Sequence, residues 1–146
     1  MKWFYRLGIF IIRGLLPLAA LFNSSITRFL NGRKDLFGKL ERFRSGNRRP
    51  VAWFPVASIG EYEQGKPVID ALKNSQPELQ IALSFFSPSG YDQLVNKPSA
   101  LIDFITYIPL DSKRQAQRFV TILKPVLVFF VKYDLWRYHI HAITRS

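Results

Sequence analysis

Short apolar runs alternate with helix-like stretches from residue 51 to the end of this sequence, and this alternation limits the possible folds most. Strand character is found in "VAWFPV" (51–56), "LQIALSFF" (79–86), "FITYI" (104–108) and "VLVFFV" (126–131). Apolar residues at helical spacing predict helices over 61–74, 91–95, 112–124 and 136–145. Strands that alternate with helices are typical of a parallel sheet covered by helices on both faces. We therefore predict an α/β, Rossmann-like domain over residues 51–146.

Three local features refine this prediction. Gly65 and Pro67 indicate that the first helix begins irregularly or starts near Lys66. The run 126–131 is the most continuously hydrophobic, so we expect it to be the most buried strand. Asp111 is placed to cap the helix over 112–124.

Parallel sheets bind ligands at the loops that follow the carboxyl ends of their strands. In this sequence those loops read "ASIGE", "SPSG", "PLDS" and "KYDLW". The sequence contains neither GxGxxG nor GxxxxGK[ST], so neither dinucleotide nor P-loop chemistry is supported. We predict no cofactor.

Glu61, in the first of these loops, has two interpretations. An acidic residue at a helix start is favoured by the helix dipole by about 0.3–1 kcal/mol, which needs no catalytic role. Gly60, however, permits a tight turn, and the free N–H groups at the helix start attract anions. From the residues alone, the structural interpretation is the simpler one.

The remaining polar candidates carry less information. His139 and His141 lie two positions apart on a helix and cannot share one ligand, so we interpret them as surface or core-edge residues. The chain has no cysteine, and we predict no metal site. Lys132 and Asp134 follow the fourth strand, where they either line the crevice or form a local ion pair.

The N-terminus is apolar from Leu7 to Phe22, interrupted by Arg13 and by Pro17. A membrane-spanning helix needs about 20 apolar residues, so this run is slightly short. It fits a short signal-anchor, a helix inserted in one leaflet, a cleaved signal peptide, or a helix packed on the domain or on a partner. We predict that residues 1–30 form a hydrophobic membrane-anchor helix.

The positive charge is concentrated near this helix. The net charge is +11, and the first 49 residues account for nine of these charges. A nucleic-acid-binding domain would carry its positive charge on the folded face, so we expect no nucleic-acid partner. We interpret residues 31–50 as a basic juxtamembrane segment whose residues 33–49 face anionic lipid head groups, and whose charge keeps the rest of the chain cytoplasmic.

Five motifs that are each weak alone occur in a specific order and spacing, and together they match a known family. The sequence resembles the 3-deoxy-D-manno-octulosonic acid (Kdo) transferases of lipopolysaccharide assembly over nearly its whole length. The matching segments are "GRKDLFGKLERF", "ASIGE", "FSPSGY", "YIPLD" and "LKPVLVFFVKYDLW".

This resemblance implies the N-terminal half of a GT-B glycosyltransferase of inverting type, at the cytoplasmic face of the cell inner membrane. Such a domain binds the lipid A precursor, and a C-terminal domain binds the donor CMP-Kdo. The family's catalytic base falls on Glu61. The resemblance assigns substrate-binding positions to Ser58, Gly60, Ser87, Ser89, Gly90 and Asp134.

Two departures from the family pattern matter. Lys132 stands where the family usually has a glutamate, so the role of that acid is not carried over. The chain also stops after a helix where the pattern requires another strand, and it lacks a donor domain. We therefore expect a piece of a longer enzyme that has no turnover alone. The alternatives are a non-catalytic, membrane-tethered module that binds a lipid or partner, and a glycosyltransferase with another nucleotide-sugar donor.

Overall fold

The computed structural model describes residues 8, 14–15, 17–97, 99–132 and 136–145. The strands are β1 (Val51–Val56), β2 (Gln80–Phe85), β3 (Phe104–Tyr107) and β4 (Leu127–Val128). The helices are α2 (Ser24–Asn31), α3 (Leu36–Arg44), α4 (Ile59–Ser75), α5 (Pro88–Asn96), α6 (Lys113–Leu123) and α7 (Arg137–Ile143).

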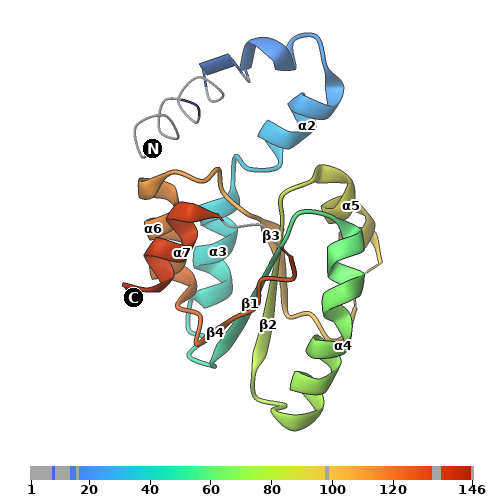
Figure 1. Cartoon of the computed structure of the whole chain (residues 1–146), viewed down its shortest axis with the longest axis vertical. Coiled ribbons are helices and arrows are strands. Elements are labelled where there is room, and N and C mark those ends of the chain that lie inside the picture. Colours follow the sequence, from blue (N-terminus) through green and yellow to red (C-terminus); the bar gives the residue numbers. More distant parts are fainter. Residues whose placement is uncertain (1–7, 9–13, 16, 98, 133–135, 146) are drawn as a thin grey trace.

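The four strands form one parallel sheet in the order β3-β2-β1-β4 (Figure 1). This confirms the predicted parallel sheet, and the order is that of the first four strands of a doubly wound fold. The chain moves outward from β1 to β3 and then returns to place β4 beside β1. In such sheets ligands bind where the strand order reverses, which here is at the carboxyl ends of β1 and β4.

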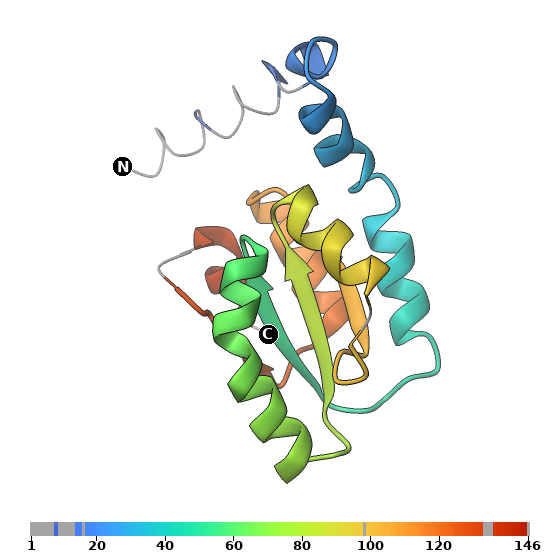
Figure 2. The same cartoon turned by 90° about the vertical axis from the view of Figure 1, so that its right-hand side faces the viewer.

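Helices cover both faces of the sheet, as the apolar pattern predicts. Val51 and Trp53 of β1 are buried on the face that packs against α3, α6 and α7. Ala52, Phe54 and Val56 alternate with them and are buried on the opposite face, under α4 and α5. Figure 2 shows α4 (green) and α5 (yellow) in front of the sheet and α6 (orange) behind it. Both faces of β1 are therefore core.

The prediction of an irregular start to the first helix is wrong. Helix α4 begins at Ile59 and continues through Pro67, whose exposed position tolerates the missing backbone hydrogen bond. Gly65 is buried, and a Cβ built on it would lie 3.0 Å from Val131 Cγ2 and 3.9 Å from Phe54 Cδ1. Glycine at this position therefore lets the helix approach the segment that follows β4 closely.

The prediction that the fourth run is the most buried strand is also wrong. Strand β4 comprises two residues at the sheet edge, where Val126 is 59% and Leu127 is 38% exposed. The carbonyl of Trp53 accepts a hydrogen bond from Phe129 N–H (2.9 Å), so alternate residues of β1 face β4. The next such residue is Pro55, which has no N–H to donate, and the β1–β4 pairing ends there.

Part of the predicted basic segment belongs to the core. Leu36 and Leu40 of α3 are buried among the residues of the Trp53 face. Phe43 stacks on Phe104 of β3 with ring centroids 4.4 Å apart, and Glu41 pairs with Arg118 of α6 at 2.9 Å. The boundary at residue 50 stays a prediction, but α3, which precedes it, covers one face of the sheet.

The described residues 17–31 lie at the carboxyl ends of the strands (Figures 1 and 2). Helix α2 begins at the N-cap Asn23, whose side chain accepts hydrogen bonds from Ser25 and Ile26 N–H. Most of the predicted anchor helix before residue 14 lies outside the described residues. Among the residues that are described, no helix has both the length and the apolar character needed to cross a bilayer.

Candidate functional site

Glu61 lies in the first turn of α4, directly after β1. Its carboxylate oxygen Oε2 accepts a hydrogen bond of 2.6 Å from the backbone N–H of Ala57. Ser58 is the N-cap residue, but its side chain makes no capping hydrogen bond. One oxygen of Glu61 therefore satisfies a backbone donor at the helix start. Within the described part of the chain, no hydrogen bond reaches the second oxygen, which can still accept a proton.

The loop that carries Glu61 and the loop after β2 are joined directly. Ser87 N–H donates to the carbonyl of Ala57 at 2.9 Å, and the hydroxyl oxygens of Ser87 and Ser89 lie 2.7 Å apart. Gly90 is buried, and a Cβ built on it would lie 3.0 Å from Ile59 N and 2.7 Å from Phe85 Cδ1. The starts of α4 and α5 are therefore neighbours.

Gly60 differs from Gly90 because its surroundings are open. Apart from its two chain neighbours and the backbone of its own helix, a Cβ built on Gly60 would meet only Ser58 Oγ within 4 Å, at 3.9 Å. Neither packing nor a left-handed backbone requires glycine at this exposed position. The structure thus leaves open space at Gly60, the residue that precedes Glu61.

Arg33 brings a positive charge to the same end of the sheet. Its guanidinium donates to the carbonyls of Phe86 (2.7 Å) and Ile108 (3.0 Å), which follow β2 and β3, and to that of Phe29 (2.9 Å) in α2. Burial lowers the pKa of Arg33 to about 10, so the side chain remains cationic at neutral pH. Burial likewise raises the pKa of the adjacent Tyr107 to about 12, so its hydroxyl stays neutral.

Asp111, in the loop after β3, does not cap the following helix. Its carboxylate accepts hydrogen bonds from Tyr138 N–H (3.1 Å) and His139 N–H (3.2 Å) in the first turn of α7. It also lies 2.8 Å from His139 Nδ1, and both side chains are buried. The N-cap of α6 is Ser112, whose hydroxyl makes no capping hydrogen bond.

The histidine interpretation is therefore half right. His141 is exposed, as predicted, whereas His139 is 0% exposed and lies against Trp53, Phe119 and Trp136. A position at the edge of the core is wrong for His139 because α7 turns this side chain inward to meet Asp111. No local pattern predicts this, since the two residues are 28 positions apart.

The loop after β4 is described only at its two ends. Lys132 is exposed, and Asp134 lies outside the described residues, so its predicted site role stays a prediction. Trp136 packs on Phe86 with ring centroids 5.0 Å apart. This loop therefore returns to the end of β2, beside Arg33 and Ser87.

Together, these loops place the Glu61 carboxylate beside the N-termini of two helices. The carboxylate can take a proton from a ligand, and the helix N-termini attract negative charge elsewhere on the same ligand. Among the described residues, no group accepts a hydrogen bond from the backbone N–H of Gly60 or of Ser89. Two surface hollows, of about 730 and 600 Å³, are lined by other residues and do not include Glu61. No group of three possible metal ligands exists in the part of the chain that the structure describes.

Sequence reasoning missed two of these features, the Asp111–His139 pair and the inward position of Arg33. Arg33 carries no sequence mark that separates it from the other basic residues of 33–49. The preceding Gly32 is a weak signal, since glycine often allows a close backbone approach.

Comparison with known proteins matches the part of the chain that contains these loops. A family model described as 3-deoxy-D-manno-octulosonic-acid transferase (kdotransferase) matches residues 34–146. A transferase of that name from Aquifex aeolicus is 32% identical over 90 residues, which cover 62% of this chain and 24% of the relative. Its namesake from Haemophilus influenzae is 29% identical over 88 residues (60% and 20%). One from Chlamydia trachomatis is 26% identical over 119 residues (82% and 27%). The chain thus spans about a quarter of the length of these relatives.

Proposed function

Because the chain belongs to the 3-deoxy-D-manno-octulosonic acid transferase family, we propose that it is the acceptor-binding part of an inverting GT-B glycosyltransferase. The complete enzyme moves Kdo from CMP-Kdo to a lipid A precursor in lipopolysaccharide biosynthesis. The family's further length supplies the domain that binds the donor. Glycosyl transfer by this chain alone is not expected.

Glu61 is the general base in this proposal. A hydroxyl oxygen of the acceptor sugar attacks the anomeric carbon of Kdo, the bond from that carbon to the CMP phosphate oxygen breaks, and the hydroxyl proton passes to Glu61. The observation that carries the assignment is the Glu61 carboxylate itself. One oxygen accepts a hydrogen bond from Ala57 N–H, while within the described chain no hydrogen bond reaches the other.

The neighbouring helix starts support an acceptor that carries phosphate. The free N–H groups of Gly60 and Ser89 lie at the positive ends of α4 and α5, which favour anions. Ser58 and Ser87 complete the proposed acceptor-binding surface, and Asp134 follows in the loop after β4. Gly90 is buried, and its proposed contribution is to let the start of α5 approach the start of α4.

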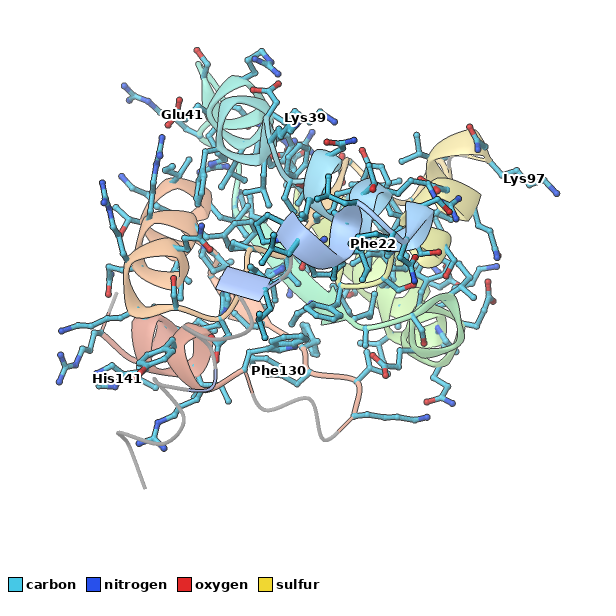
Figure 3. All side chains as sticks on the ribbon, turned by 90° about the horizontal axis from the view of Figure 1, so that it is seen from above. Phe22, Lys39, Glu41, Lys97, Phe130 and His141 are labelled. Carbon is cyan, nitrogen blue, oxygen red and sulfur yellow. The ribbon has the colours of Figure 1, made fainter. Side chains whose placement is uncertain are left out.

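We propose attachment to the cytoplasmic face of the inner membrane, and the described residues just before α2 support contact with a membrane. Four large apolar side chains before α2 are strongly exposed, namely Leu15, Leu18, Leu21 and Phe22. In the view from above, Phe22 lies near the middle of this end of the molecule, with Lys39 and Lys97 farther out (Figure 3). Apolar side chains flanked by basic ones suit an anionic bilayer surface.

The direct test joins this chain to a donor domain of the family and replaces Glu61 by glutamine. Glu61→Gln keeps an oxygen that can accept the Ala57 N–H, so the fold is expected to be retained. It removes the proton acceptor, so we expect kcat for Kdo transfer to fall about 10²–10⁴-fold, the usual contribution of a general base.

Glu63→Gln is the matched control, because Glu63 is exposed on the same helix and lies two positions away. This variant is expected to retain full transfer activity. Transfer by Glu61→Gln at the rate of the Glu63→Gln control would refute the assignment of the base.

A further inference from the structure

Helix α2 is held on the domain by very few contacts of its own. None of its residues is buried, although it lies against the start of α5 and the carboxyl ends of the strands. Phe29 packs edge-on against Phe86 with ring centroids 5.1 Å apart. Since a helix without buried side chains gains little from packing, something else must hold it in place.

Arg33, directly after α2, provides that connection. Its guanidinium donates to a carbonyl of α2 and to the carbonyls that follow β2 and β3, so one side chain joins three segments. The guanidinium carbon lies 3.7 Å from the Phe29 ring centroid, and 5.3 and 4.8 Å from those of Phe86 and Tyr107. No carboxylate pairs with Arg33 in the described part of the chain, and its protein partners are carbonyl oxygens and aromatic faces.

Gly32 is a second, independent sign that the chain after α2 packs closely on the domain. A Cβ on Gly32 would overlap the Tyr107 ring, which is itself stacked on Tyr91 with ring centroids 4.1 Å apart. The backbone of Gly32 has right-handed helical angles (φ −59°, ψ −23°) that any residue adopts. Glycine is therefore needed here for the close approach to Tyr107 and not for backbone conformation.

A continuous path of hydrogen bonds runs from Arg33 to Glu61. Arg33 Nη2 holds the carbonyl of Phe86 at 2.7 Å, and the next residue, Ser87, donates its N–H to Ala57 O at 2.9 Å. Ala57 N–H in turn donates to Glu61 Oε2 at 2.6 Å. A shift of the Phe86–Ser87 backbone would therefore reach the segment that orients the carboxylate.

We propose that Arg33 is a positioning residue for the candidate site, and that together with Gly32 it fixes α2 against the Ser87 loop and so orients the loop of Glu61. The inference rests on the proposed function, since it gives a catalytic purpose to the position of Glu61. It assigns Arg33 an inward role, unlike the lipid-facing role expected for residues 33–49.

Amide hydrogen exchange of this chain, followed residue by residue by NMR, tests the inference without any transfer assay. In Arg33→Met, the amides of Gly32 and Ser87 are expected to exchange about tenfold to a hundredfold faster, because hydrogen bonds from a charged group stabilise a local structure by that factor. The amide of Leu83, in the middle of β2, is expected to keep its exchange rate.

Three further variants separate geometry from charge. Arg33→Lys keeps the charge but loses the planar fork, and Gly32→Ala pushes the backbone away from Tyr107, so both are expected to behave like Arg33→Met. Arg28→Met is the matched control, since Arg28 is an exposed arginine on α2 itself. It is expected to exchange like the wild type.

An unchanged Ser87 amide in Arg33→Met would overturn the inference, as would full protection in Arg33→Lys. Equal acceleration at Leu83 would also overturn it, because Arg33 would then support only global stability. A failure of the proposed function is seen separately, as undiminished Kdo transfer by Glu61→Gln.

Discussion

At the residue scale, the functions of the acidic side chains depend on the partners that the fold supplies. Glu61 and Asp111 both follow a strand, and the sequence predicts that each lies at the start of the next helix. The structure places Glu61 in the first turn of that helix, bonded to Ala57. It places Asp111 on a different helix, α7, where backbone N–H groups and His139 surround its carboxylate.

Removing the Asp111 carboxylate should therefore be costly. Asp111→Ala leaves the buried N–H group of His139 and its ring without their partner, and we expect the free energy of unfolding in urea to fall by about 1–3 kcal/mol or more. Asp35→Ala is the control, because the Asp35–Arg42 pair is exposed and such pairs contribute about 0–1 kcal/mol. Equal losses in the two variants would contradict the role assigned to Asp111.

At the element scale, the segment just before α2 differs from the rest of the described chain in the exposure of its large apolar side chains. Leu18 is 60%, Leu21 is 75% and Phe22 is 92% exposed, a pattern that is unfavourable in water. Large apolar side chains gathered at one end of a molecule are typical of a surface that binds a membrane or a partner. The basic residues that follow favour an anionic bilayer.

We accordingly predict binding of this chain to vesicles that contain phosphatidylglycerol. The double variant Leu18→Ser/Phe22→Ser should bind at least tenfold more weakly in a sedimentation assay, since burying each such side chain is worth about 1.5–3 kcal/mol. Val68→Ser, which changes an exposed apolar residue on α4, serves as the control. Equal binding by the double variant and this control would argue against a membrane-facing role for this surface.

At the scale of the whole molecule, the domain needs a helix that precedes its first strand. Helix α3 lies on the Trp53 face of the sheet, where Leu36 and Leu40 are buried with Phe119 and Leu123 of α6. Without α3, this part of the core would be exposed to water.

Two shortened chains test this requirement. A chain of residues 24–146 is expected to keep a cooperative urea transition by circular dichroism. A chain of residues 51–146 should lose it, because two fully buried leucines contribute about 1.5–3 kcal/mol each to a total of about 5–15 kcal/mol. A cooperative transition of similar midpoint in the shorter chain would show that the domain begins at β1.

Local pattern was sufficient to predict much of this molecule. The apolar runs, the helical spacing between them and the strand–helix alternation are properties of neighbouring residues, and they predicted all four strands and the parallel sheet. The same order of strands places the loops of Glu61 and Ser87–Gly90 at one end of the sheet. Hydrophobic periodicity carries this information because it reports which side of each element is buried.

Other features depended on pairings between residues far apart in the sequence. The run 126–131 predicts the most buried strand, but its partner β1 has Pro55 where pairing would continue, so β4 stays short and at the edge. His139 is buried because Asp111 lies opposite it, and Arg33 turns inward because three carbonyls and three aromatic rings meet around it. Hydrophobic periodicity does not report contacts of this kind. Each contact joins residues that are far apart in the sequence, and only the tertiary structure brings them together.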